Sequence, residues 1–166
     1  MTVVRKATVQ ELNEIMDIYA MARSFMRNTG NANQWKNIYP PKELLEKDIE
    51  LGNLYLVCEE EDILAVFAFI PGVDPTYNEI EGAWLNDKPY AAIHRVASAG
   101  KKKGMLHECV KYALKYSDNI KIDTHNDNKV MQHQLEKEGF IRCGIIKLEN
   151  GEPRIAYQKW SGSDEN

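Results

Sequence analysis

Apolar positions recur along this chain with two periods, and the two periods predict strands interleaved with helices. Spacings of three and four residues predict helices at residues 12–25, 44–51 and 126–138, and another that begins after Gly104. Short apolar runs between turn residues predict strands at residues 3–7, 54–58, 63–70, 90–97, 120–123, 140–148 and 153–160. This alternation, closed by an antiparallel hairpin, predicts an α/β fold: a mixed sheet with helices on both faces.

Local signals sharpen several of these elements. Thr8 followed by Glu11 is a capping box that opens the first helix, and Asn150-Gly151 is a two-residue hairpin turn between the last two strands. The run from Ile63 to Ile70 is apolar throughout, so we expect that strand to be covered on both faces. The first helix is expected to bury Leu12, Ile15, Met16, Tyr19, Ala22 and Phe25.

The stretch 28–41, NTGNANQWKNIYPP, is rich in turn formers around Trp35 and Tyr39. Two interpretations fit such a loop with exposed or half-exposed aromatics. It is a lid over a pocket, or it is a loop pinned to the core by its aromatic side chains. The sequence favours the second.

The composition indicates one ordinary globular domain, residues 1–160, with a polar tail at 161–166. A chain of 166 residues with 43% hydrophobic and 28% charged residues can bury a core of its own. Its formal net charge of −4 provides no overall attraction to nucleic acid or to an anionic membrane, so neither is expected as a partner.

Cysteine usage and apolar run lengths bear on the compartment. Cys58, Cys109 and Cys143 are odd in number and lie among apolar neighbours, which favours reduced core residues over disulfides. The longest apolar run, Ile63 to Ile70, is far shorter than a bilayer span, and the first ten residues lack the apolar stretch of a signal peptide. We expect a cytoplasmic protein.

Three lysines stand where a helix is about to begin, in the segment ASAGKKKGM. Helix N-termini carry partial positive charge, so each lysine there is disfavoured by about 0.3 to 1 kcal/mol. A bound anion would reverse that cost, because backbone N–H groups of a glycine-containing turn can converge on one phosphate. The alternative, a solvated basic loop, stays open at this point.

Two well-known phosphate loops do not fit this segment. A P-loop requires Gly-Lys-Ser/Thr, whereas Gly104 is followed by Met105. A dinucleotide-binding fingerprint requires three glycines in a tight pattern, and only Gly100 and Gly104 are present.

The order of motifs resembles the GNAT superfamily of acyl-CoA-dependent N-acyltransferases. Its signature, Gln/Arg-x-x-Gly-x-Gly/Ala after the fourth strand, is similar to Lys101-x-x-Gly104-x-Leu106, with Lys101 and Leu106 as departures. Downstream, the strand IKID, Asn128-x-x-Met131 and the segment KEGF resemble the family's second half, and IHRVA and NGEPRIAYQKW resemble a bacterial subgroup. The resemblance implies a mostly antiparallel central sheet with helices on both faces.

By this resemblance acetyl-CoA is the co-substrate. The resemblance places its diphosphate on the turn and its pantetheine beside the preceding strand. The residues implied are Val96, Ala97, Ser98, Lys101, Lys102, Lys103, Gly104, Met105 and Leu106. Asn128 is expected to start the next helix or to contact the cofactor directly or through water.

Acyl transfer to an amine requires a base that titrates near neutral pH. His94 and His125 are the catalytic candidates, because histidine titrates closest to that range, and Glu79 and Glu81 are further candidates. His94 is equally compatible with a satisfied core histidine, and His125 with a residue that braces a turn. The family's leaving-group tyrosine aligns with Leu135, so that role is vacant or filled elsewhere.

The segment DTHNDN raises the question of a metal, because Asp123, His125 and Asp127 alternate. A calcium loop requires Gly and Glu where this chain has Asn128 and Gln134, so no metal is expected.

The predicted acceptor is a primary amine of a small molecule or a peptide. Its pocket is expected between the loop of Trp35 and Tyr39, the segment from Tyr77 to Trp84, and the last hairpin near Tyr157. Transfer of a larger acyl group and a non-catalytic CoA sensor remain alternatives. A homodimer through an exposed sheet edge is also possible.

Overall fold

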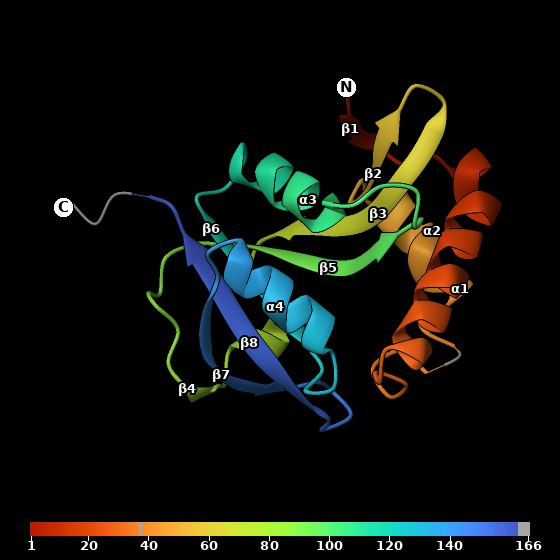
Figure 1. Ribbon diagram of the computed structural model, residues 1–166. Coiled ribbons are helices and arrows are strands. Elements are labelled where there is room, and N and C mark those ends of the chain that lie inside the picture. The colour runs from red at the N-terminus through yellow and green to blue at the C-terminus, as the bar shows by residue number, and fades with distance from the viewer. Residues whose placement is uncertain (37, 163–166) are drawn as a thin grey trace.

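The computed structural model describes residues 1–36 and 38–162, and in that part the chain forms one eight-stranded sheet with helices on both faces (Figure 1). The strands are β1 (Val3–Lys6), β2 (Leu54–Glu59), β3 (Asp62–Pro71), β4 (Glu81–Gly82), β5 (Ala91–Ser98), β6 (Asn119–Thr124), β7 (Ile141–Lys147) and β8 (Pro153–Trp160). The helices are α1 (Leu12–Asn28), α2 (Lys42–Glu50), α3 (Met105–Leu114) and α4 (Lys129–Lys137), with short 3-10 turns η1 (Val9–Glu11) and η2 (Pro75–Tyr77).

The sheet order is β1-β2-β3-β5-β6-β8-β7-β4. Every neighbouring pair is antiparallel except β5 and β6, which run parallel. The mixed, mostly antiparallel sheet predicted from the sequence is therefore confirmed.

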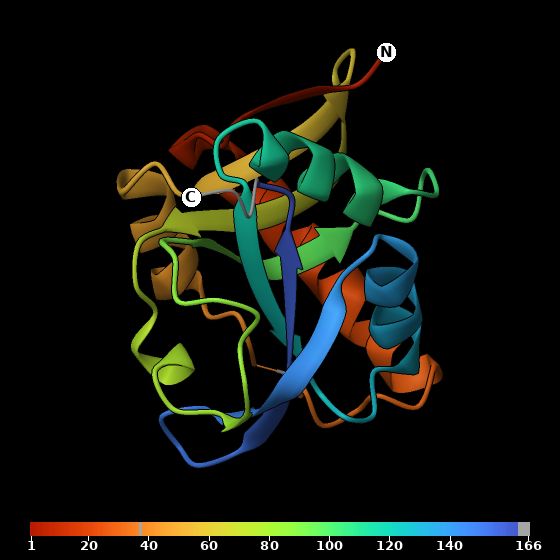
Figure 2. The same ribbon diagram turned by 90° about the vertical axis from the view of Figure 1, so that its left-hand side faces the viewer.

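Two apolar layers enclose the sheet, with α1 and α2 on one face and α3 and α4 on the other (Figures 1 and 2). Along β2, Leu54 and Leu56 pack toward α1 and α2, whereas Tyr55 and Val57 pack toward α3. This period of two follows from the pleat, which points successive side chains to opposite faces. The buried residues of β3 likewise divide between the two layers, which confirms that the apolar run from Ile63 to Ile70 is covered on both faces.

The helix boundaries follow local signals. Gly104, in the left-handed conformation, is the N-cap of α3, as predicted. α4 begins at Lys129, later than predicted, because the side-chain oxygen of Asn128 accepts from the Met131 N–H and caps the helix there. Ahead of α1, the Glu11 carboxylate accepts from the Thr8 N–H, but the chain first makes η1.

One buried-face prediction was wrong. Phe25 is 55% exposed, because the buried stripe of α1 passes through Ile18 and Ala22 and continues to Met26 in the last turn. Met26, four residues after Ala22, lies closer to that stripe than Phe25, which is three residues after Ala22.

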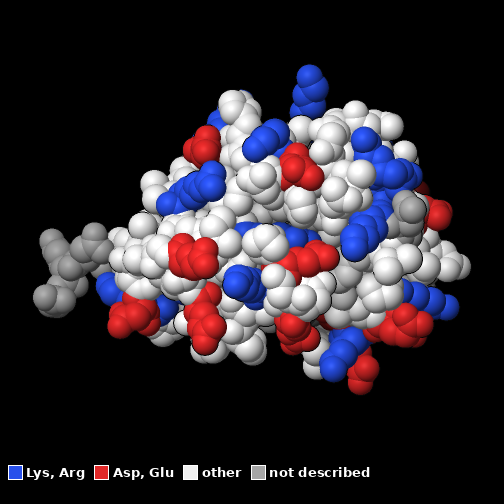
Figure 3. Space-filling model, turned by 90° about the horizontal axis from the view of Figure 1, so that it is seen from below, with Lys and Arg blue, Asp and Glu red and all other residues white. Residues whose placement is uncertain are grey.

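The remaining global features concern the cysteines, membrane spans and surface charge. Cys58, Cys109 and Cys143 are free thiols, the first two buried. Among the described residues, no helix combines the length and the apolar character required to cross a bilayer. On the face drawn in Figure 3, acidic and basic side chains are interspersed.

Candidate active site

The two parallel strands at the centre of the sheet diverge (Figure 2). β5 pairs with β6 only at Ala91 with Ile120 and at Ala92 with Lys121. From Ile93 to Ser98 the edge of β5 that faces β6 has no strand partner in the described chain. Except for the Arg95 carbonyl, which accepts from the Tyr19 hydroxyl, the backbone N–H and C=O groups on that edge are therefore available to a ligand.

A bulge shapes the same part of β5. Ala97 pairs with Val66 and His94 pairs with Ala68, so Arg95 and Val96 together lie opposite Phe67. Arg95 has a φ of 53°, which is uncommon for a residue with a side chain. Such bulges re-aim side chains beside active sites.

The turn between β5 and α3 is open on its outer side. Gly100 and Gly104 both have positive φ, and a Cβ built on either would meet no atom within 4 Å. Leu106, which departs from the family signature, buries its side chain in the core under α3, so it does not fill the turn. The open turn at the start of a helix fits a diphosphate.

The lysines of this turn are exposed, and two of them have acidic partners. Lys102 forms an ion pair with Glu59 at 3.0 Å, and Lys101 lies 3.6 Å from a carboxylate oxygen of Asp62. Glu59 ends β2 and Asp62 begins β3, so the two acids flank the turn between these strands. The basic character of the turn is thus partly neutralised by its neighbours.

His94 lies between two carboxylates on the face that α1 and α2 cover. Its Nε2 is 2.9 Å from Asp74 Oδ2, and its Nδ1 is 3.9 Å from Asp123 Oδ2. Asp74 also accepts from the backbone N–H and the hydroxyl of Thr76. Burial opposes ionisation of Asp74, but the hydrogen bonds from His94 and Thr76 outweigh it and lower the pKa of this carboxyl to about 2.

Aromatic side chains surround the Asp123 side of this group. The buried Tyr77 hydroxyl donates to Asp123 at 2.7 Å, and burial, with the nearby Asp123 charge, raises the pKa of Tyr77 well above its usual value. The Lys121 ammonium lies 4.0 Å from the ring centre of Trp84 and 3.9 Å from that of Tyr90. Burial lowers the pKa of Lys121.

The loop between α1 and α2 reaches across to the other half of the sheet. Gln34 Oε1 accepts from Asn128 Nδ2 at 3.0 Å and from the Thr124 hydroxyl at 3.3 Å. Arg154 of β8 donates to the Gln34 carbonyl at 3.3 Å. Trp35 is buried and packs against Tyr19 and Tyr39, which confirms that this loop is pinned by its aromatics.

His125 belongs to a different hydrogen-bond group from His94. Its Nδ1 accepts from the Asp127 N–H at 2.9 Å, which is the turn-bracing contact that the sequence allowed. Burial, and secondly the charge of Arg154, lower the pKa of this imidazole. The segment DTHNDN thus directs its polar groups to separate partners: Asp123 faces His94, and Asn128 caps α4.

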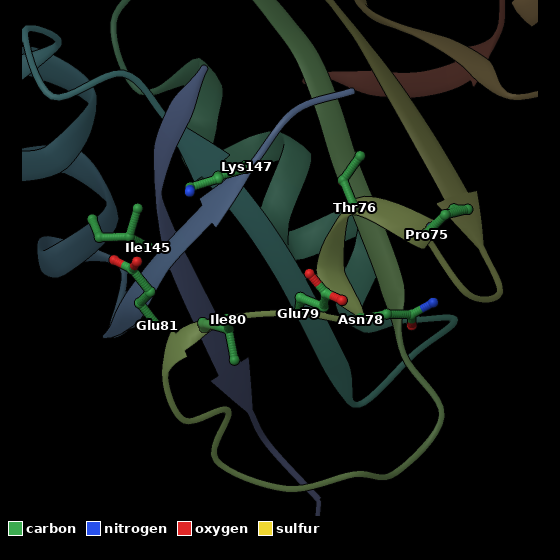
Figure 4. Close-up of a pocket in the computed structure, with 8 residues that line it drawn as sticks. All are labelled: Pro75, Thr76, Asn78, Glu79, Ile80, Glu81, Ile145 and Lys147. Carbon is green, nitrogen blue, oxygen red and sulfur yellow. The ribbon is translucent and has the colours of Figure 1, made fainter. Parts of the chain in front are cut away.

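The acidic candidates lie outside the His94 group. Glu79 and Glu81 are exposed and, with Ile145 and Lys147, line a hollow of about 520 Å³ beside β7 (Figure 4). They are not hydrogen-bond partners of His94, whose carboxylate neighbours are Asp74 and Asp123.

Two buried side chains on the opposite face of the sheet, Tyr157 and Leu135, bear on the expected acceptor pocket and on the expected acid, respectively. Tyr157 is fully buried among the residues under α3 and α4, on the other side of the sheet from Trp35 and Tyr77, so its side chain does not line a shared pocket with them. The hairpin reaches the loop of Trp35 through Arg154 instead. Leu135 is fully buried too, so that position supplies no acid.

Sequence reasoning missed Asp74 and underrated Asp123. From the sequence, Asp74 is assigned no role and Asp123 is considered only as a metal ligand. A buried strand histidine with carboxylates in two flanking segments was the available signal, but one sequence does not say which carboxylates approach it.

Solved structures are similar to this chain over nearly its whole length. A GNAT-family acetyltransferase from Streptococcus agalactiae is 30% identical, with a TM-score of 0.86 over 98% of this chain and 96% of that one. A GNAT-family acetyltransferase from Listeria monocytogenes (20% identical, TM-score 0.71, covering 96% of this chain and 94% of that one) shares the fold. So does a ribosomal-protein-alanine N-acetyltransferase from Brucella melitensis (17%, TM-score 0.63, 95% and 99%). No protein-family model and no curated protein matches the chain.

Proposed function

Because the chain belongs to the GNAT family of acetyltransferases, we propose that it transfers an acetyl group from acetyl-CoA to a primary amine of a small molecule or a peptide. The observation that carries the proposal is the divergence of β5 from β6 between an open glycine-lysine turn and a histidine paired with a carboxylate. The three free cysteines fit a cytoplasmic setting.

The cofactor half of the proposal rests on the turn and the free edge of β5. The diphosphate would lie against the N–H groups of Met105 and Leu106 at the start of α3, with Lys101, Lys102 and Lys103 beside it. The pantetheine would run along Val96, Ala97 and Ser98 on the edge that β6 leaves free. Asn128 would approach it from the start of α4, as an indirect contact, because its side-chain amide already binds Gln34 and Met131.

The base is proposed to be His94, and its tautomer follows from Asp74. The Asp74 carboxyl, with a pKa of about 2, is ionised at neutral pH and can only accept a hydrogen bond. Nε2 of His94 must therefore carry the proton of the hydrogen bond between His94 and Asp74. Nδ1 then keeps its lone pair. It faces Asp123, whose charge would stabilise the imidazolium once Nδ1 takes a proton.

The proposed transfer balances without a separate acid. The neutral amine nitrogen bonds to the thioester carbonyl carbon, the carbon–sulfur bond breaks, and the proton lost by the amine passes to Nδ1 of His94, directly or through a water. The departing thiolate needs one proton, and the imidazolium of His94 returns to it the proton that Nδ1 took from the amine. A buried Leu135 is therefore compatible with turnover.

The acceptor is proposed to enter on the face that holds His94. The pinned loop with Gln34 and Trp35 lies on this face, and the aromatic group of Tyr77, Trp84 and Tyr90 lies beside His94. Aromatic rings with few polar groups suit the alkyl part of an amine substrate.

A melting experiment followed by a thiol-release assay tests the proposal. Acetyl-CoA at 100 times its dissociation constant is expected to stabilise the fold by about 2.7 kcal/mol. Thiol release over a panel of small amines and peptides should then identify the acceptor class. An unchanged melting temperature with acetyl-CoA would contradict cofactor binding. Binding without thiol release for any amine would instead favour a CoA sensor. A preference for longer acyl-CoA would favour transfer of an acyl group larger than acetyl.

A further inference from the structure

Arg95, the residue at the bulge of β5, is held from three elements. Its guanidinium forms two hydrogen bonds to Asp48 of α2, from Nε to Oδ2 at 2.9 Å and from Nη2 to Oδ1 at 3.0 Å. Its Nη1 donates to the Tyr39 hydroxyl at 3.2 Å. The Tyr19 hydroxyl of α1 donates to the Arg95 backbone carbonyl at 2.6 Å. Side chain and backbone of one residue are thus both fixed.

This group lies out of solvent. The side chains of Arg95 and Asp48 are 10% and 5% exposed. Buried ion pairs contribute little net stability compared with apolar residues of the same volume, so stability alone explains such a pair poorly. A bidentate pair does provide fixed geometry, because the planar guanidinium matches both carboxylate oxygens.

What the geometry fixes is an unfavourable backbone conformation. Arg95 has a φ of 53°, and a positive φ is unfavourable for a residue with a Cβ. The contacts of Asp48, Tyr39 and Tyr19 hold it there. On one side of Arg95 in the chain is His94, and on the other are Val96 and Ala97, which the proposed function assigns to the base and to the pantetheine edge.

We propose that Asp48 and Arg95 are positioning residues that hold the bulge of β5 in the conformation required for acetyl transfer. The inference rests on the proposed function of the same site. Through Arg95, Asp48 sets the direction of the β5 backbone groups that meet the pantetheine and the direction of His94. The Tyr39 contact links the same bulge to the loop on the acceptor side, so α1, α2 and that loop are all tied to one residue.

The test compares D48N with E11Q as a matched control. D48N keeps the shape of the side chain but removes the charge and one of the two acceptors of Arg95. E11Q does the same to Glu11, which forms two hydrogen bonds with Arg5 away from β5. We expect D48N to weaken acetyl-CoA binding and to lower kcat at least tenfold each, measured well below its melting temperature, whereas E11Q changes both less than twofold.

Amide hydrogen exchange provides a readout that separates positioning from general destabilisation. In D48N, exchange is expected to accelerate in residues 93–99 and to stay unchanged in β8. R95K keeps the positive charge but cannot bridge both oxygens of Asp48 and the Tyr39 hydroxyl together, so its kcat should fall between those of D48N and the wild type.

A folded D48N with acetyl-CoA affinity and kcat like those of E11Q would overturn the proposal. If D48N does not fold, Y39F and R95K test the proposal in its place. A kcat within twofold of that of E11Q in both variants would then overturn it. The two proposals fail differently. A wild-type protein that does not respond to acetyl-CoA contradicts the proposed function. Unchanged hydrogen exchange at residues 93–99 in D48N, or in R95K if D48N does not fold, contradicts the positioning role of Asp48 and Arg95.

Discussion

His94 on β5 and Asp74 at the start of η2 are twenty positions apart in the chain, and their side chains meet at 2.9 Å. Asp74 is fixed for this contact because its other carboxylate oxygen caps η2 by accepting from Thr76. One side chain therefore connects a local turn to a strand of the central sheet. The pair also decides which nitrogen of His94 is free to accept a proton.

Removing the base or its partner should affect catalysis to different degrees. H94Q is expected to lower kcat about 100-fold or more, the usual contribution of a general base. D74N should lower kcat about tenfold, because an amide can still contact Nε2 but no longer fixes one tautomer. E79Q is expected to stay within twofold, since Glu79 lies in a separate exposed hollow. Steady-state thiol release measures all three, and a large loss in E79Q would contradict the assignment.

Asp74 should also make stability depend on pH in one direction. The pKa of its carboxyl is about 2 in the folded protein, against an ordinary value of 3.8, so folding favours the ionised form. The stability that this ionised form contributes is therefore full above about pH 4 and is lost as the pH falls toward 2. The unfolding free energy of D74N should be lower by about 2 kcal/mol at pH 7, and the gap should shrink below pH 4. Urea titrations from pH 7 to pH 3 measure it. A gap that widens on acidification would contradict the stabilising hydrogen bond between His94 and the Asp74 carboxylate.

The lysine turn offers two opposite substitutions. Alanine at Lys101, Lys102 and Lys103 together should weaken acetyl-CoA binding, and more so at low salt, because exposed charges are screened as salt rises. E59Q with D62N should strengthen binding about two- to threefold, because it frees two lysines and removes two negative charges near the proposed diphosphate. Calorimetric titration at two salt concentrations measures both. Equal affinity in all variants would support a merely solvated loop.

Features set by neighbouring residues in the chain could be predicted from the sequence, and features set by distant ones could not. The start of α3 at Gly104 follows from a local pattern, and so does the antiparallel pairing of β7 with β8. The contact between Gln34 and Asn128 joins residues 94 positions apart, and the bidentate contact of Arg95 with Asp48 joins residues 47 apart. No periodicity encodes such pairs.

The same limit explains the two misplaced aromatics. Phe25 has the right residue type and nearly the right spacing to be buried, but the exact rotation of α1 brings Met26 to the core instead. The acceptor pocket is expected from the sequence to include the last hairpin near Tyr157. The strand pleat points its side chain to the other face, and the register that decides this is a tertiary property.

Restoring the family's tyrosine should not help this chain. Leu135 is fully buried in the core under α4, so L135Y would force a larger side chain and a hydroxyl into a packed, apolar site. Overpacking of this kind costs about 1 to 3 kcal/mol. We expect a lower melting temperature and no gain in kcat, with L135M as the control for a tolerated change of shape. A rise in kcat in L135Y would show that the thiolate does need a separate acid.

Gln34 provides the sharpest test of the acceptor side. Its single side-chain oxygen accepts from Asn31, Thr124 and Asn128, so Q34A leaves three part-buried donors without that acceptor. We expect destabilisation of about 1 to 3 kcal/mol. The KM for the amine should rise at least fivefold, because the loop is no longer tied to the end of β6.

The cofactor side should respond differently to the same substitution. Asn128 keeps its cap on the Met131 N–H in Q34A and gains a free amide, so affinity for acetyl-CoA should be unchanged or higher. Q134A, at an exposed position of α4, is the matched glutamine-to-alanine control. Measuring KM for the amine separately from the dissociation constant of acetyl-CoA distinguishes the two effects. An unchanged amine KM in a folded Q34A would place the acceptor elsewhere, whereas loss of acetyl-CoA binding alone would make Gln34 part of the cofactor site.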